Sequence, residues 1–274
     1  MIKPVHKISD SLKGRNHTPD LLKGAAVIFM IQVHIVELLW NPELFSGSWG
    51  KVFLFLGGPP AAPVFMLMMG YYLALSQKSA RQLIRRGILV FAGGILLNIL
   101  LNFSLLVLIF SGSADYNPLH YILGADILPL AGLSIIIIAL LRIIRINPLP
   151  VFISAFAAFS VIHYFLPFNY LAENETLRYV LAFVFTREFW SYFPLFPWIL
   201  YPLAGYIAAL VFGKIKIPDF IIYSSAALFL PFLYFTLPYV ESEITSLSAY
   251  YHHDLFLAVW ILFFCAGFAA AVYI

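Results

Sequence analysis

The stretch PDLLKGAAVIFMIQVHIVELLW, residues 19–40, is long enough and apolar enough to cross a bilayer as a helix. It nevertheless begins with Asp20 and Lys23 and carries His34 and Glu37 near its far end. An ionisable side chain at the centre of a membrane helix costs about 2.5–3.5 kcal/mol. Four such residues in one span therefore indicate a role beyond membrane insertion.

Apolar runs of similar length recur along the rest of the chain. Hydrophobic residues make up 62% of the sequence and charged residues 11%, against about 25% charged in soluble domains. This composition excludes a soluble enzyme and predicts an all-α, polytopic transmembrane helical bundle of about eight spans. We expect the spans near residues 20–40, 52–76, 84–110, 120–141, 148–166, 193–212, 218–237 and 255–274.

The basic residues are divided unequally between the two sides of this predicted bundle. Thirteen of the sixteen lie on the side of the N-terminus, and Lys51, Arg178 and Arg187 lie opposite. By the positive-inside rule the N-terminus is cytoplasmic, and we expect a multi-pass protein of the cell inner (plasma) membrane. The net charge is only +3, and no nucleic-acid partner is expected. The one cysteine, Cys265, excludes a disulfide framework.

No linker divides the chain, so we expect a cytoplasmic tail over residues 1–18 and a single bundle over 19–274. There is no internal repeat, which disfavours a transporter built from repeated halves. The outer connection, residues 166–193, contains an apolar run that is too short to span. We expect that run to lie in the membrane interface or to re-enter the membrane.

Two of the predicted spans contain residues that interrupt a helix. The second span includes Gly57 and Gly58 followed by two prolines, and the sixth includes Pro194, Pro197 and Pro202. Backbone groups freed by such a break must be satisfied by protein or by water in a cavity. The breaks are therefore either tolerated kinks or the lining of a polar cavity.

The ionisable residues of the first span fall on one helix face. Asp20, Lys23, His34 and Glu37 fit steps of three and four residues, and Lys23 and His34 are about 16 Å apart along the axis. We expect this stripe to face the bundle interior, with His34 as a base oriented by the carboxylate of Glu37. Alternatively, Asp20 and Lys23 are interfacial, Glu37 reaches the outer water, and His34 is structural.

Four stretches of the chain resemble, in order, motifs of the transmembrane acyltransferase superfamily. That superfamily includes the polysaccharide O-acyltransferases, and the heparan-alpha-glucosaminide N-acetyltransferase-like branch with its bacterial members is most similar. The first-span motif is an Asp, a basic residue and Gly, and then a His ten residues further on. The stretches are DLLKG (20–24) with His34, AAPVFMLMMGYYLALS (61–76), ADILPLAGLSIIIIALL (125–141) and FPWILYPLAGYIAAL (196–210).

The resemblance implies an acyl-CoA-dependent acyltransferase. Such a protein passes an acyl group, acetyl above all, from cytosolic acyl-CoA to a hydroxyl or amine of an extracytoplasmic sugar, which makes it an enzyme of polysaccharide modification. Its expected partners are acyl-CoA as co-substrate, a glycan or lipid-linked sugar acceptor, and membrane lipid, with a homo-oligomer as a further expectation. No metal is expected.

Cationic side chains are available for the CoA phosphates at the cytoplasmic end. They are Lys23, Arg81, Arg85 and Arg86. The alternative for the arginines is that they serve only as positive-inside signals. Relatives commonly have Arg where this chain has Lys23, so the two-pronged contact of a guanidinium is replaced by a point charge. Relatives also usually continue through further spans after the eighth, which implies a shortened version here.

The substrate cavity is expected to be lined by polar side chains of several spans and by the interrupted backbone of the second span. The candidates are Asp20, Gly57, Gly58, Asn98, His120 and Asp126. By helical rise, residues 57–60 and His34 lie at a similar depth, so we expect free N–H groups of that segment to form an oxyanion site.

His163 is expected to be a packing residue. His252, His253 and Asp254 lie close together, but their spacing does not match a zinc motif.

Two other functions remain open on the sequence. One is a proton-coupled transporter or flippase in which Asp20, His34, Glu37 and Asp126 form a proton relay. The other is a catalytically inactive membrane subunit that has kept the fold.

Overall fold

The structure of the chain is a computed structural model that describes residues 17–39, 47–144, 146–167, 170 and 172–274. Within these residues the regular elements are helices. One isolated β-bridge pairs Ala125, just before α8, with Ser191, in the segment before α11. The helices are α1 (Thr18–Leu39), α3 (Ser48–Gly57), α4 (Ala62–Leu75), α5 (Ala80–Leu101), α6 (Phe103–Phe110), α7 (Pro118–Ile122), α8 (Ile127–Leu141), α9 (Pro148–Phe165), α10 (Glu175–Ala182), α11 (Leu195–Trp198), α12 (Leu200–Phe212), α13 (Asp219–Ile244), α14 (Leu247–Tyr251) and α15 (Leu255–Tyr273).

The predicted all-α membrane bundle is confirmed. Among the described residues, seven helical stretches are long and apolar enough to cross a membrane, with α3 and α4 together forming the second. The predicted fourth span is the shorter helix α8, of 15 residues. It is shorter than expected because residues 118–126 form the separate helix α7 and a turn that ends at Asp126, the N-cap of α8.

Other boundaries also differ from the sequence prediction. The predicted third span is divided at Asn102 into α5 and the short helix α6. The outer connection contains α10, of eight residues, which agrees with a run too short to span. Five of the thirteen basic residues assigned to the side of the N-terminus lie outside the described part of the chain: Lys3, Lys7, Lys13, Arg15 and Arg145.

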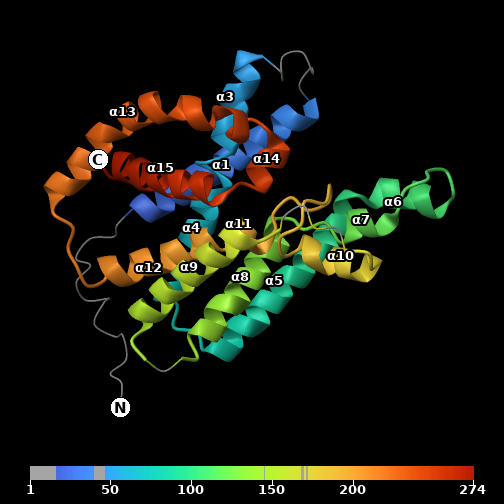
Figure 1. Cartoon of the computed structure of the whole chain (residues 1–274), viewed down its shortest axis with the longest axis horizontal. Helices are drawn as coiled ribbons and strands as arrows, with labels where there is room; N and C mark the ends of the chain where they lie inside the picture. The colour runs from blue at the N-terminus through green and yellow to red at the C-terminus, as the bar shows by residue number, and fades with distance from the viewer. Residues whose placement is uncertain (1–16, 40–46, 145, 168–169, 171) are drawn as a thin grey trace.

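The helices form two groups joined by α4 (Figure 1). In one group α5 packs on α8 and α12 packs on α9, and in the other α13 packs on α15. Helix α4 contacts α8 and α12 of the first group and α1 and α15 of the second. The largest hydrophobic core includes buried residues of α4, α8, α12 and α15, so both groups share it.

The tightest helix contacts depend on small residues. A methyl group at Gly70 of α4 would overlap the carbonyl of Pro202, and one at Gly205 of α12 would overlap the carbonyl of Leu67. Without a hydrophobic force between helices in lipid, such close backbone approach lets van der Waals contact hold a helix pair together. Gly87 and Gly132 allow the same approach between α5 and α8.

Both predicted interruptions are present. Helix α3 ends at Gly57 and α4 begins at Ala62, with the turn between them buried. The sixth span consists of α11 and α12, with a non-helical backbone conformation at Phe196. The helix of the second span is therefore interrupted where the glycines and prolines predicted it.

Candidate active site

Helix α1 buries a different face from the one that carries its charges. Its buried residues are Leu22, Ala26, Val33 and Val36, and the helix packs on α3, α4 and α15. His34 has a side-chain exposed fraction of 65%, and Glu37 one of 22%. The expectation that the charged stripe faces the bundle interior was therefore wrong. The apolar stripe fills that interface, and the ionisable stripe lies beside it, exposed at Lys23 and His34.

His34 and Glu37 form the pair that the sequence predicted. Nδ1 of His34 lies 3.1 Å from Oε2 of Glu37, one helical turn further on. A carboxylate oxygen can only accept, so Nδ1 carries the proton of this hydrogen bond. In the neutral ring the lone pair is then on Nε2, on an exposed side chain that a substrate can reach.

Asp126 also acts on His34. Although 92 residues separate it from His34 in sequence, its carboxylate acts electrostatically on the His34 ring, as does that of Glu37. Oδ1 of Asp126 accepts a hydrogen bond of 2.6 Å from the N–H of Ile127 and so caps α8. The carboxylates of Glu37 on α1 and of Asp126 at the start of α8 thus both act on His34, and we call these three residues the His34 group.

The backbone just before Asp126 is held by hydrogen bonds to two other parts of the chain, the 190–193 segment and α5. The N–H of Ala125 donates to the carbonyl of Trp190 at 2.8 Å, and its carbonyl accepts from the N–H of Phe193 at 2.6 Å. From α5, the Asn98 amide donates to the carbonyl of Gly124 at 2.9 Å. Asn98 is itself buried, so it holds this backbone in place and does not line an open cavity as we expected.

Tyr251, at the end of α14, is a member of this group that the sequence analysis missed. Burial raises the pKa of its phenol, and the negative charges of Glu37 and Asp126 raise it further. The indole N–H of Trp198 donates to the Tyr251 carbonyl at 2.8 Å. Tyr192, whose ring lies 5.6 Å from that of Tyr251, also has its pKa raised by burial and then by Asp126. No motif could have predicted Tyr251, because only the fold brings α14 to the end of α1.

A buried hydrogen-bond network supports the backbone next to Tyr251. Nδ1 of His253 lies 2.6 Å from the carbonyl of Tyr250, and Nε2 lies 2.6 Å from the hydroxyl of Tyr201 on α12. Burial lowers the pKa of His253 to about 3, so the ring is neutral. A carbonyl can only accept, so Nδ1–H donates to it and the Tyr201 hydroxyl donates to Nε2.

At the opposite end of α1, Asp20 and Lys23 both contact Tyr72 of α4. The Tyr72 hydroxyl donates to Oδ1 of Asp20 at 3.0 Å, and Nζ of Lys23 lies 5.1 Å from the centre of the Tyr72 ring. Arg142, after α8, donates to the carbonyls of Leu73 and Ser76 and so caps α4 at the same end. Asp20 is thus far along α1 from His34.

The predicted CoA-binding arginines lie near this end. Arg81, Arg85 and Arg86 are exposed on the first turns of α5, which follows α4 after a short connection. The structure therefore gathers the cationic candidates at one end of the bundle and His34, Glu37 and Asp126 at the other.

His120 lies in a separate aromatic group. Its ring stacks on that of Trp190 with centroids 4.0 Å apart and contacts Phe189 edge to face. Arg178 binds the buried Glu188 with two hydrogen bonds of 2.9 Å in the same region. The charges that act on His120 are those of Arg178, Glu188 and Glu175, and not those of the His34 group.

The two glycines of the second span also have a role other than the expected one. A methyl group at Gly57 would overlap Val33 of α1, so this glycine allows α3 to approach α1 closely. The N–H of Gly58 donates to the carbonyl of Phe55 at 3.1 Å, and that of Ala61 donates to Gly58 at 3.0 Å. The two residues between them are prolines, which have no N–H. The expectation of an oxyanion site here was therefore wrong.

His163 is buried and its ring is parallel to that of Phe196, which fits a packing residue. In the part of the chain that the structure describes, no group of three or more His, Cys, Asp or Glu side chains is arranged to hold a metal ion.

Comparison with known proteins gives one finding that bears on function. The profile of the family described as heparan-alpha-glucosaminide N-acetyltransferase, catalytic, matches residues 15–237. This range begins just before α1 and contains His34, Glu37 and Asp126. Neither the curated proteins nor the solved structures gave a match.

Proposed function

Because this chain belongs to the heparan-alpha-glucosaminide N-acetyltransferase catalytic family, a family of membrane acyltransferases, we propose that it transfers an acetyl group from cytosolic acyl-CoA to an amine or hydroxyl of an extracytoplasmic sugar. The observation that carries the proposal is the contact of His34 with Glu37, in a group that Asp126 joins from a distant part of the sequence.

His34 is the base in this proposal. Its Nε2 accepts the proton of the acceptor hydroxyl or amine while the acceptor atom attacks the thioester carbonyl. The bond between the carbonyl carbon and sulfur breaks, and the CoA thiolate leaves and takes the proton from the imidazolium, which returns His34 to its neutral form. Glu37 fixes the tautomer with Nδ1 protonated, and the carboxylates of Glu37 and Asp126 stabilise the imidazolium that forms.

The donor enters from the cytoplasmic end. Lys23, Arg81, Arg85 and Arg86 bind the phosphates of CoA, and the acyl arm extends along the exposed stripe of α1 towards His34. Lys23 and His34 are eleven residues apart, about 16 Å. The side chains between them on α1 are apolar apart from Gln32, which suits a thioester arm.

That same stretch argues against the proton relay. Asp20 and His34 are separated by about 21 Å along α1, and no titratable side chain of this helix lies between Lys23 and His34. A proton path along α1 would therefore have to cross three turns of apolar residues.

Transfer of label from radiolabelled acetyl-CoA in inverted vesicles tests the proposal. We expect label on a glycan or lipid-linked sugar, and a rate lowered by about 10²- to 10⁴-fold in His34→Ala, the usual contribution of a general base. His17→Ala is the matched control, because His17 is exposed and precedes α1. If wild-type vesicles neither bind nor consume acetyl-CoA, the proposal fails. Binding without turnover would show an inactive subunit.

The same assay separates two routes of transfer. If the acetyl group passes directly to the acceptor, the protein carries no label when the acceptor is left out. If His34 is itself acetylated first, label is retained on the wild-type protein and is absent from His34→Ala.

A further inference from the structure

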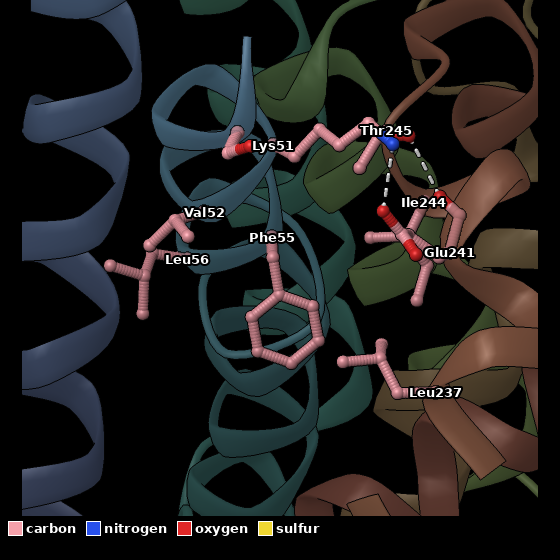
Figure 2. Close-up of a pocket in the computed structure, with 9 residues that line it drawn as sticks. Lys51, Val52, Phe55, Leu56, Leu237, Glu241, Ile244 and Thr245 are labelled. Atoms are coloured by element: carbon pink, nitrogen blue, oxygen red, sulfur yellow. Dashed lines mark hydrogen bonds and ion pairs between the residues drawn. The ribbon is translucent and has the colours of Figure 1, made fainter. Parts of the chain in front are cut away.

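A cavity of about 370 Å³ lies between α3 and α13, on elements that the proposed reaction does not use. Figure 2 shows it, with Lys51 and Phe55 pointing from α3 towards α13. Its volume is within the range of about 300–1,000 Å³ usual for small-molecule sites. The lining residues are Ser48, Lys51, Val52, Phe55, Leu56, Leu237, Glu241, Ile244 and Thr245.

The lining changes from charged to apolar along the helices. At one end Nζ of Lys51 lies 2.9 Å from Oε1 of Glu241 (Figure 2). Phe55 and Leu237 are each four residues, about 6 Å, further into their spans. A ligand that fits this cavity therefore has a charged end and a hydrocarbon end.

The charged end lies at the depth of lipid head groups. Lys51 is in the first turn of α3 and Glu241 in the last turn of α13, so both are at the ends of spans. Trp49 and Tyr239, two residues before Lys51 and Glu241, are exposed. Exposed Trp and Tyr at the ends of spans are typical of the membrane–water interface.

The two charges are open to a ligand. The exposed fraction of the side chain is 55% for Lys51 and 43% for Glu241. An ion pair this exposed contributes little to stability, so a ligand can replace it at low cost. A ligand that separates Lys51 from Glu241 must then pair with each of them. It therefore carries one anionic and one cationic group close together.

We propose that this cavity binds a zwitterionic phospholipid with a primary ammonium in its head group, phosphatidylethanolamine. Lys51 binds the phosphate, Glu241 accepts hydrogen bonds from the ammonium, and one acyl chain lies along Phe55 and Leu237. An anionic lipid such as phosphatidylglycerol satisfies Lys51 but has no cation for Glu241, only neutral hydroxyls. The site requires no assumption about acyl transfer.

Competition between two lipids with identical acyl chains tests this proposal. Delipidated full-length protein in detergent receives equal amounts of phosphatidylethanolamine and phosphatidylglycerol, and native mass spectrometry measures the ratio of the two adducts. We expect wild type to prefer phosphatidylethanolamine by about tenfold, as expected for one charge-assisted hydrogen bond. Glu241→Gln removes the anion, and the preference should shift to phosphatidylglycerol.

Two variants complete the experiment. The double variant Lys51→Glu with Glu241→Lys keeps one charge of each sign and should keep the preference for phosphatidylethanolamine. Glu173→Gln, an exposed outer residue that does not line the cavity, is the matched control and should behave as wild type. Equal binding of both lipids by wild type, or an unchanged ratio in Glu241→Gln, would overturn the proposal.

Discussion

The helix pair α4 and α12 differs sharply from α1 and α13 in how it is packed. About half of the residues of α12 and of α4 are buried, and the two backbones touch at Gly70 and Gly205. Helix α1 buries only one narrow face, α13 buries only Val240 and Ile244 near its end, and many large apolar side chains of both helices are exposed. The exposed residues of α13 include Leu230, Tyr234 and Tyr239.

The charges follow this division. His34 and Glu37 lie on α1, and Glu241 lies on α13, whereas α4 and α12 contain no charged side chain. In lipid, a charge on a closely packed helix would be buried without water, whereas one beside an open face can reach solvent or a substrate. The closely packed helices therefore fix the frame, and the side chains to which we assign the proton transfer and the lipid site lie mostly on the loosely packed ones.

The largest effect is expected from enlarging a glycine of the closely packed pair. Gly70→Leu would drive a side chain into the Pro202 backbone, which cannot move aside as a flexible side chain can. We expect destabilisation of about 3 kcal/mol or more and loss of monodisperse protein in size-exclusion chromatography. Gly93→Leu is the control, because nothing lies within 4 Å of a methyl group there. Equal behaviour of the two variants would remove the distinction between the two regions.

A smaller loss is expected at Asn98, which joins the frame to the site. Asn98→Leu leaves the buried carbonyl of Gly124 without its donor and should cost about 1–3 kcal/mol in thermal unfolding. Because Gly124 precedes Asp126 by two residues, acetyl transfer should fall as well. Asn102→Leu is the comparison, since Asn102 is only half-buried and donates mainly to the Asn98 carbonyl. A loss of stability in Asn102→Leu as large as that in Asn98→Leu would contradict this role.

Removing one carboxylate from the site should affect the reaction and spare the fold. Glu37→Gln keeps a hydrogen-bond acceptor for Nδ1 of His34 but removes the charge that stabilises the imidazolium. We expect the transfer rate to fall about tenfold, as expected when a charge-assisted bond becomes neutral, with no change in melting temperature. An unchanged rate, or a large drop in melting temperature, would show that Glu37 serves the structure instead.

The smallest of the measured effects is expected at the ion pair between α3 and α13. Lys51 and Glu241 are both about half exposed, so Glu241→Gln should change the free energy of unfolding by less than about 1 kcal/mol. Thermal unfolding in detergent measures this value. A cost similar to that of Asn98→Leu would mean that this ion pair holds α13 in place. It would contradict the distinction between the closely and the loosely packed helices.

Much of the fold could be predicted from the sequence because hydrophobic length alone determines where spans lie. The runs at 148–166 and 255–274 agree with α9 and α15 to within a residue. The runs at 84–110 and 120–141 were predicted too long, because the breaks at Asn102 and before Asp126 come from hydrogen bonds between segments. Those bonds, from Asn98 and Asn102 to the 121–124 backbone, have no pattern in the sequence.

The site could be predicted only in part. His34 and Glu37 were paired correctly because they are one turn apart on a single helix. Which face of α1 is buried depends on α3, α4 and α15, and the role of Gly57 depends on Val33 across the contact. Tyr251 joins the site only through the path of the chain after α13, and periodicity carries no information on such a contact.

The measurement that tests the account most directly is the initial rate of acetyl transfer by His34→Ala, with and without added imidazole. The side chain of His34 is exposed, so a free imidazole can take its place as a base. We expect a rate about 10²- to 10⁴-fold below wild type that imidazole partly restores. A wild-type rate, or a loss that imidazole does not relieve, would contradict the assignment of His34 as the base of the reaction.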